Sequence, residues 1–222
     1  MSQGMIGYMI QQSLYNVFLK NGINKKITTI LTQVVVDKDD PSFKSPTKPI
    51  GAFVSEAEAL KYIKEKNETW IEDSGRGWRK VVASPKPLDI VEIDTIVNLI
   101  DAGTIVIASG GGGIPVIFKE KKLVGIEAVI DKDLTASLLA KKISADMLLI
   151  LTDVPKVAIN YNSPNEKYLD TMTITEARNF LQEGQFGKGS MAPKVEAAIN
   201  FAEAGGEAII TSLSEAYKAI EG

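Results

Sequence analysis

The 222-residue sequence contains no histidine and no cysteine. Without cysteine, the chain has no disulfide, no thiolate nucleophile and no cysteine-type zinc site. Without histidine, it has no Ser-His-Asp triad, no imidazole base and no HExxH zinc site. If the protein is an enzyme, its chemistry must depend on lysine, arginine, carboxylates, hydroxyl groups, backbone amides or a bound ion.

The sequence also lacks long apolar runs and a strong excess of charge. No run reaches the length of about 18 apolar residues that a membrane span needs, and residues 1–10 lack the basic start of a signal peptide. A net charge of −3 gives no general attraction to nucleic acid or to an anionic membrane. We therefore expect a cytoplasmic protein, without nucleic-acid or membrane partners, that has one main domain and an insertion.

The most informative stretch begins at Thr104. Residues 105–108 are apolar and uncharged, as in a central parallel strand covered on both faces. Four glycines follow directly: Gly110, Gly111, Gly112 and Gly113. Glycine amides can approach an anion closely, and ligands of open α/β sheets bind beyond the carboxyl ends of strands. A flexible turn is the alternative, but the position after an apolar strand favours an anion site.

Two lysines occur at the predicted starts of two helices. Asp131 is suited to cap one helix, which places Lys132 and Asp133 in its first turn. A lysine is unfavourable near the positive end of a helix dipole, so Lys132 has either no role or a ligand there, and we favour a ligand. In GQFGKGSMAPKV, Ser190 is expected to cap the second helix, with Lys194 just behind Pro193.

The remaining main-domain elements follow from periodicity. Residues 5–20 predict a helix with a broad apolar face, for which core packing and a subunit interface are equally favoured. Residues 27–36 predict a β-branched strand, and Leu88 to Ala102 predict a helix. Met147 to Leu151 predict another apolar strand.

The composition of residues 37–87 is typical of an inserted subdomain, and residues 1–36 and 88–222 form the predicted main domain. The insertion is bounded by proline-rich segments and contains one helix from Ser55 to Lys66, with a capping box. Lys48 stands directly before a proline on this insertion and is therefore rigidly presented. A solvated surface lysine is the alternative.

Neither common phosphate-binding motif is present, because Ile114 and Pro115 follow the glycines. Glycine loops with isolated lysines and no obvious base suit phosphoryl transfer to an acceptor that is already an anion. Positioning and charge neutralisation supply most of the rate in such a reaction. Lys48, Lys132 and Lys194 are the candidates for that role.

The segments MSQGMIGY, VDKDDP, PTKPIG, DSGRGWRKVVASPKP, GGGGIPV, GIEAVIDKDLTASLLA, GQFGKGSMAPKVEAA and GGEAIITSL resemble carbamate kinases of the amino acid kinase family, over nearly the whole chain. The resemblance implies an α/β fold, a three-layer αβα sandwich with a largely parallel central sheet, in which residues 37–87 are the protruding lid subdomain. It also implies a cytoplasmic homodimer of arginine metabolism that reversibly converts ATP and carbamate to ADP and carbamoyl phosphate.

The same resemblance assigns roles to residues. Lys132 and Lys194 would hold the transferring phosphoryl group, Asp133 would orient Lys132, and Lys48 would reach in from the insertion. The four glycines would hold the carbamate, and Mg²⁺ would bridge the nucleotide phosphates. The residues that would flank the nucleotide are Thr152, Asp153, Val154, Gly187, Gly189, Ser190 and Met191, within the 187–191 loop.

The sequence also departs from the family pattern. Family members begin with a strand and a GGNA-type phosphate loop, then an HGNGPQVG-type loop, and end in a short strand. We expect the N-terminal glycine-loop region and the final strand to be missing here. Two alternatives follow: a catalytically inactive nucleotide-binding or dimerisation fragment, and a related kinase with another acceptor, such as acetylglutamate or a nucleoside monophosphate.

Overall fold

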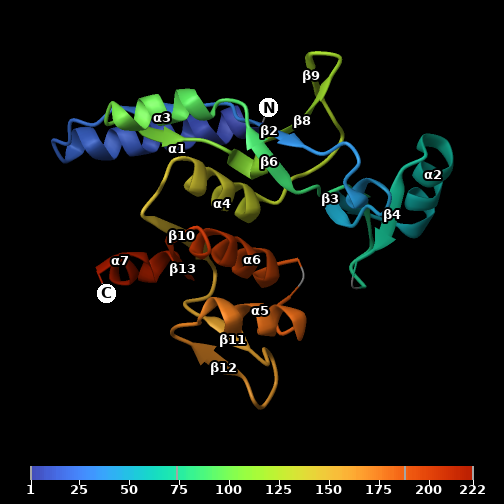
Figure 1. Cartoon of the computed structure of the whole chain (residues 1–222). Helices are drawn as coiled ribbons and strands as arrows, with labels where there is room; N and C mark the ends of the chain where they lie inside the picture. Colours follow the sequence, from blue (N-terminus) through green and yellow to red (C-terminus); the bar gives the residue numbers. More distant parts are fainter. Residues whose placement is uncertain (1, 74, 188, 222) are drawn as a thin grey trace.

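The computed structural model describes residues 2–73, 75–187 and 189–221 and has an α/β fold (Figure 1). The helices are α1 (Ser2–Lys20), α2 (Glu56–Lys66), α3 (Ile93–Asp101), α4 (Lys132–Lys142), α5 (Ile174–Gln182), α6 (Met191–Ala202) and α7 (Ala216–Glu221), with short 3-10 helices η1 (Pro41–Phe43), η2 (Gly110–Gly112) and η3 (Leu213–Glu215). Over the described residues, no helix is both long and apolar enough to cross a membrane.

Within the main body, three of the described strand pairs are parallel and three are antiparallel. The strands are β1 (Ile27–Thr29), β2 (Gln33–Val36), β3 (Lys48–Val54), β4 (Thr69–Glu72), β5 (Trp78–Val82), β6 (Pro87–Ile90), β7 (Ile105–Ile107), β8 (Ile114–Lys119), β9 (Lys122–Gly125), β10 (Met147–Thr152), β11 (Val157–Ile159), β12 (Lys167–Leu169) and β13 (Glu207–Ser212). Strands β1 and β7, β2 and β8, and β10 and β13 are parallel pairs. The predicted α/β fold with parallel strand pairing is confirmed.

The strand predicted over residues 27–36 is interrupted. β1 pairs with β7, and β2 pairs with β8. Both paired strand segments are therefore interrupted at the level of the glycine turn η2, which lies between β7 and β8. Gln3 of α1 fills the break: its Oε1 accepts from the Thr32 amide at 2.7 Å, and its Nε2 donates to the carbonyls of Thr32 and Gly110 at 3.3 and 3.2 Å. The Ser109 amide donates to Thr32 Oγ1 at 2.8 Å. Helix α1 is thereby attached to the glycine turn.

The insertion forms its own small sheet, which protrudes beside the main body (Figure 1). Its strand order is β3-β5-β4, all antiparallel, and α2 packs against it. The predicted capping box of α2 is confirmed, because Ser55 Oγ accepts from the Glu58 amide and Glu58 Oε2 accepts from the Ser55 amide.

The helix predicted from Leu88 to Ala102 is wrong at its start. Residues 87–90 form β6, which pairs antiparallel with β2, and the helix begins at Ile93. Glu92 fixes this turn, since its carboxylate accepts from the Gln33 amide at 2.7 Å and from Gln33 Nε2 at 2.8 Å. Pairing with a central strand thus outweighs the helical periodicity of these residues.

Helix α1 contributes little to the core that the described residues form. Gly7 is its buried residue, and a Cβ there would come within 2.2 Å of Thr29 Cγ2. Its large apolar side chains, among them Met5, Tyr8 and Met9, are exposed. The broad apolar face of α1 therefore lies open on this surface.

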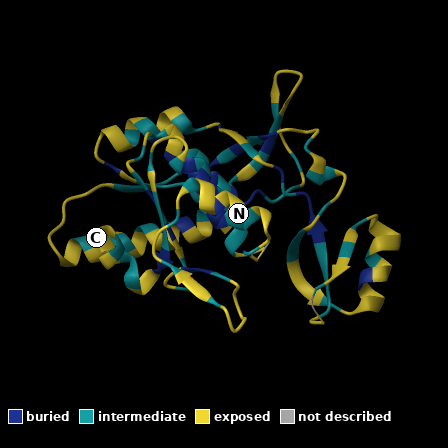
Figure 2. Cartoon of the chain, turned by 60° about the horizontal axis from the view of Figure 1, so that its bottom comes forward, coloured by how far each residue is buried: buried dark blue, intermediate teal, exposed yellow. Residues whose placement is uncertain are grey.

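Buried residues gather where the sheets meet the helices that cover them, whereas α2 is mostly exposed (Figure 2). One cluster includes Val34, Ile90 and Ile130 and lies around β2 and β6. A second cluster, which includes Ala197 and Phe201, joins α4, β10 and α6. The second cluster fixes α4 against α6 and so determines which side chains of their first turns can meet.

Replacing Phe201 by alanine should lower the free energy of unfolding by about 3–5 kcal/mol, because a fully buried aromatic ring is removed without collapse of the site. Phe201 is 2% exposed. Chemical denaturation measures the change, and Tyr161→Ala, at an exposed position, is the control, with an expected change within about 0.5 kcal/mol. Similar losses in both variants would contradict the position of this cluster.

Candidate active site

The first turn of α4 is the structural centre of the site. Asp131 is the N-cap residue of the helix, and its Oδ1 accepts from the Asp133 amide at 2.9 Å. The predicted helix start is confirmed, with Lys132 and Asp133 in the first turn. The positive end of the helix dipole favours an anion at this position, while the amides of Asp133, Leu134 and Thr135 already donate to Asp131.

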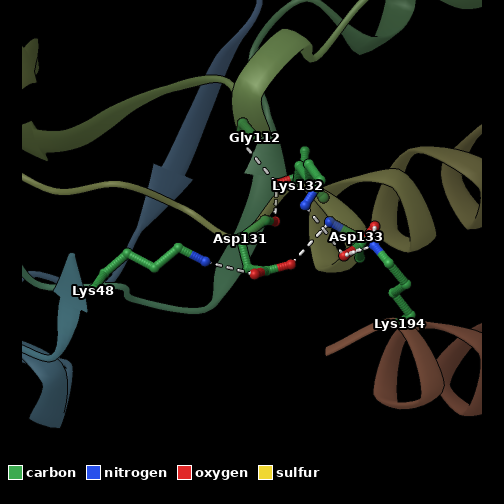
Figure 3. Close-up of polar contacts among 7 residues, drawn as sticks. Lys48, Gly112, Asp131, Lys132, Asp133 and Lys194 are labelled. Carbon is green, nitrogen blue, oxygen red and sulfur yellow. Dashed lines mark hydrogen bonds and ion pairs between the residues drawn. The ribbon is translucent and has the colours of Figure 1, made fainter. Parts of the chain in front are cut away.

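Asp133 forms a buried ion pair with Lys194 of α6 (Figure 3). Lys194 Nζ lies 3.2 and 3.0 Å from the two carboxylate oxygens of Asp133, and the two side chains are 10% and 9% exposed. Lys132 Nζ is 3.6 Å from Asp133 Oδ2, and its side chain is 64% exposed. Asp133 therefore fixes Lys194 closely and holds Lys132 more loosely.

Lys48 reaches the same helix turn from the insertion. Its Nζ donates to Asp131 Oδ2 at 2.8 Å, across 83 positions of sequence. Lys48 is the first residue of β3, opposite Val82 of β5. The structure thus brings together Lys48, Lys132, Asp133 and Lys194, four of the predicted site residues, around one helix start (Figure 3).

The glycine turn packs on this helix start through its backbone. Thr135 Oγ1 donates to the carbonyl oxygens of Gly112 and Asp131, at 3.0 and 3.2 Å. Gly112 has φ +97°, and a Cβ there would lie 2.3 Å from the Ile130 carbonyl oxygen, so this position requires glycine. The amides of Gly112 and Gly113 donate to Ser109 and Gly110 within the turn. An anion bound here would therefore be met by the other two glycine amides, those of Gly110 and Gly111.

The residues expected near the nucleotide lie on β10 and at the start of α6. Thr152 ends β10, and its Oγ1 donates to Asp153 Oδ1 at 3.0 Å; Val154 follows directly. Gly187 and Gly189 precede α6, and Met191 begins it. Lys188, in the same predicted loop, lies outside the described residues.

The predicted capping by Ser190 is wrong. Ser190 occupies the N-cap position of α6, but its φ and ψ of −133° and −76° are not those of a capping residue, and its side chain makes no capping hydrogen bond. The backbone of the glycine-rich loop directs this side chain towards Gly187, where an added Cβ would lie 2.7 Å from Ser190 Oγ.

Sequence reasoning missed three contributors to the site. Asp131 was predicted as a cap alone, although it is also the partner of Lys48. Gln3 and Thr135 hold the glycine turn, and neither carries a local sequence signal for that role. No local pattern marks Asp131 as the partner of Lys48, because this contact depends on how the insertion sits on the main body.

The donor groups of this site do not form a metal site of their own. No group of three or more acidic side chains that would hold a metal ion occurs within residues 2–73, 75–187 and 189–221. Asp131 and Asp133 are instead paired with lysines. A divalent ion with its preference for several oxygen ligands would need oxygens from a bound substrate.

Comparison with known proteins places this arrangement in a family. The model of the "Amino acid kinase family" matches residues 47–212. The carbamate kinase of Thermococcus kodakarensis is 55% identical over 223 residues, covering 100% of this chain and 71% of the relative, and that of Pyrococcus furiosus is 52% identical with the same coverage. The crystal structure of carbamate kinase from Giardia lamblia bound to AMP-PNP superposes with a TM-score of 0.91 at 48% identity, covering 100% of this chain and 71% of that one.

The chain therefore belongs to the amino acid kinase family and is a kinase. Within this family it groups with the carbamate kinases, which it matches over its whole length.

The pKa of the Asp131 carboxyl is shifted by its partners. Burial alone would raise this pKa, but the hydrogen bond and positive charge of Lys48, together with the amides of Asp133 and Leu134, outweigh burial and lower it from 3.8. The folded protein therefore holds Asp131 ionised at a pH where the unfolded chain takes up a proton. Its stabilising contribution is present above the unfolded value and is lost as the pH falls through the folded value.

The stability difference between the wild type and Asp131→Asn should be constant near neutral pH and should shrink below about pH 4, where the unfolded carboxyl begins to bind a proton. Asparagine keeps the capping oxygen, so the variant removes the charge and the oxygen that accepts from Lys48 but leaves the cap. Urea denaturation of both proteins between pH 6 and pH 3 measures the difference. A difference that stays constant down to pH 3 would contradict the lowered pKa.

Proposed function

We propose that this protein is a carbamate kinase, which reversibly transfers a phosphoryl group between ATP and carbamate to give ADP and carbamoyl phosphate. The observation that carries the proposal is the cluster of Lys48, Lys132 and Lys194 around the first turn of α4. Relatives that are 55% and 52% identical to this chain over its whole length are named carbamate kinases, which supports this choice of acceptor.

In the proposed reaction, a carbamate oxygen forms a bond to the γ-phosphorus of ATP while the bond from that phosphorus to the bridging oxygen breaks, and ADP leaves. The attacking oxygen is already an anion, so no general base is required. Negative charge develops on the transferring group and on the leaving oxygen. Lys132, Lys194 and the start of α4 would neutralise this charge, with Asp133 fixing Lys194.

Lys48 would join these groups when the insertion closes. We infer that residues 37–87 act as a lid, since Lys48 lies on the small sheet β3-β5-β4 yet contacts the main body at Asp131. Lid closure of this kind excludes water and completes the set of charged groups. The glycine turn, packed on the same helix start through Thr135, would receive the carbamate.

The nucleotide would lie along β10 and the start of α6. Its proposed contacts are Thr152, Asp153, Val154, Gly187, Gly189, Ser190 and Met191. Mg²⁺ would be held mainly by the nucleotide phosphates, since the acidic side chains beside the lysines are already paired. In this proposal the enzyme is cytoplasmic and serves arginine metabolism.

We also propose that the protein is a homodimer, with the exposed apolar face of α1 at the interface. Met5, Tyr8 and Met9 together offer a large apolar surface of the kind that interfaces between subunits bury. Light scattering coupled to size exclusion should give twice the 24.0 kDa of one chain. Met9→Glu should shift the mass towards one chain, because burial of a charge opposes association. A wild-type mass of 24.0 kDa at micromolar concentration would contradict the dimer.

Lys132→Ala should lower kcat at least about a hundredfold, as loss of one group that stabilises transition-state charge typically does. ATP formation from ADP and carbamoyl phosphate measures the rate. Lys141→Ala, in the last turn of the same helix, is the matched control and should retain the wild-type rate. Near-normal turnover of the Lys132 variant would contradict its role.

Two outcomes with the wild type would overturn the proposal more broadly. Thermal stabilisation by ADP without turnover would identify a nucleotide-binding module without catalysis. Turnover with acetylglutamate or a nucleoside monophosphate, in preference to carbamate, would identify a different acceptor.

A further inference from the structure

We propose that Asp131 is a positioning residue for Lys48: its carboxylate receives the Lys48 ammonium and thereby sets where the insertion closes on the main body. This role rests on the proposed phosphoryl transfer, to which Lys48 contributes charge. Asp131 itself would touch neither the nucleotide nor the acceptor.

The two carboxylate oxygens of Asp131 have separate partners. Oδ1 accepts from the Asp133 amide at 2.9 Å and so caps α4, whereas Oδ2 accepts from Lys48 Nζ at 2.8 Å (Figure 3). The capping bond fixes the plane of the carboxylate. The second oxygen is therefore held towards the insertion, and the Asp131 side chain is only 9% exposed.

The backbone of Asp131 is fixed as well. Its carbonyl oxygen accepts from both the amide and the hydroxyl of Thr135, at 3.1 and 3.2 Å. Just before it, the Ile130 carbonyl lies close against Gly112, and the Val129 amide donates to the Ala83 carbonyl at the base of the insertion. Asp131 is thus held by contacts within the main body, whereas Lys48 belongs to the insertion.

A second ion pair joins the insertion to the main body and provides a comparison. Lys80 of β5 lies 2.9 Å from Glu127 of the main body and 3.1 Å from Glu68 of the insertion. The Glu127 side chain is 75% exposed, so solvent screens this pair strongly. The pair of Lys48 with the buried Asp131 is screened less and has the tighter geometric constraint.

This difference matters because charge neutralisation depends on position. Lys48 has a long, flexible side chain on a unit that protrudes from the main body. Asp131 keeps the ammonium of Lys48 at the helix turn that carries Lys132 and the buried Asp133–Lys194 pair. Without that acceptor, the ammonium would sample many positions in solvent, and its contribution to the transition state would fall.

Kinetic measurements on Asp131→Asn test the role. Asparagine keeps the cap and the shape but removes the charge. We expect kcat for ATP formation to fall about tenfold to a hundredfold, as for a reacting group displaced by about an ångström, with a change in KM for ADP of less than about threefold. In a Lys48→Ala background, the same substitution should have almost no further effect on kcat.

Glu127→Gln is the matched control, since it breaks another ion pair between the insertion and the main body, one with an exposed acceptor. It should leave kcat unchanged. If it lowers kcat as much as Asp131→Asn, general attachment of the insertion explains the loss and the positioning role is overturned. Independent, multiplicative losses from Lys48→Ala and Asp131→Asn would overturn it too, because a purely structural contribution of Asp131 does not depend on Lys48.

Hydrogen exchange over residues 48–54 separates this proposal from the proposed function, because it needs no turnover. Exchange without nucleotide should be faster in Asp131→Asn than in the wild type and unchanged in Glu127→Gln. Lys48→Met, which leaves the cap of α4 intact, should give the same acceleration if Asp131→Asn folds poorly. Absence of turnover in the wild type would refute the kinase proposal alone. Unchanged exchange in both Asp131→Asn and Lys48→Met would refute the Asp131–Lys48 proposal.

Discussion

The ion pair between Asp133 and Lys194 is the interaction on which the site depends. Both side chains are almost fully buried, and a buried charge is tolerated only when a partner and hydrogen bonds compensate for its lost hydration. The pair forms because the apolar cluster around Ala197 and Phe201 holds α6 against α4. The position of these charges therefore depends on the packing of the core. A shift of either helix would leave one charge buried without its partner.

The three lysines differ in how firmly they are held. The side chain of Lys194 is 10% exposed, that of Lys48 is 31% exposed and that of Lys132 is 64% exposed. Lys194 is thus the most closely enclosed of the three, Lys132 is the most exposed, and Lys48 comes from the insertion. The three lysines outnumber the two aspartates and leave an excess of positive charge at a helix start. This charge suits a polyphosphate, and such a site needs neither of the residues that the sequence lacks, histidine and cysteine.

Local signals in the sequence predicted much of this structure. The cap of α4 at Asp131, the capping box of α2 and the parallel strands follow from residue type and periodicity, which act over a few neighbours. Residues 87–90 were mispredicted because pairing with β2 decides their conformation. The Ser190 cap failed because a glycine-rich loop sets its backbone angles. The pairing of Asp131 with Lys48 depends on how the insertion sits on the main body, which no local pattern encodes.

The separation of the site residues along the chain also has a kinetic consequence. The first turn of α4 can form by itself, but its contacts to Lys48 and Lys194 close loops of 83 and 61 positions, and Gln3 reaches Gly110 across 107. Loop closure of this length is slow compared with helix formation. The charged cluster is complete only when these distant segments have come together, so a partly folded molecule would lack a complete anion site.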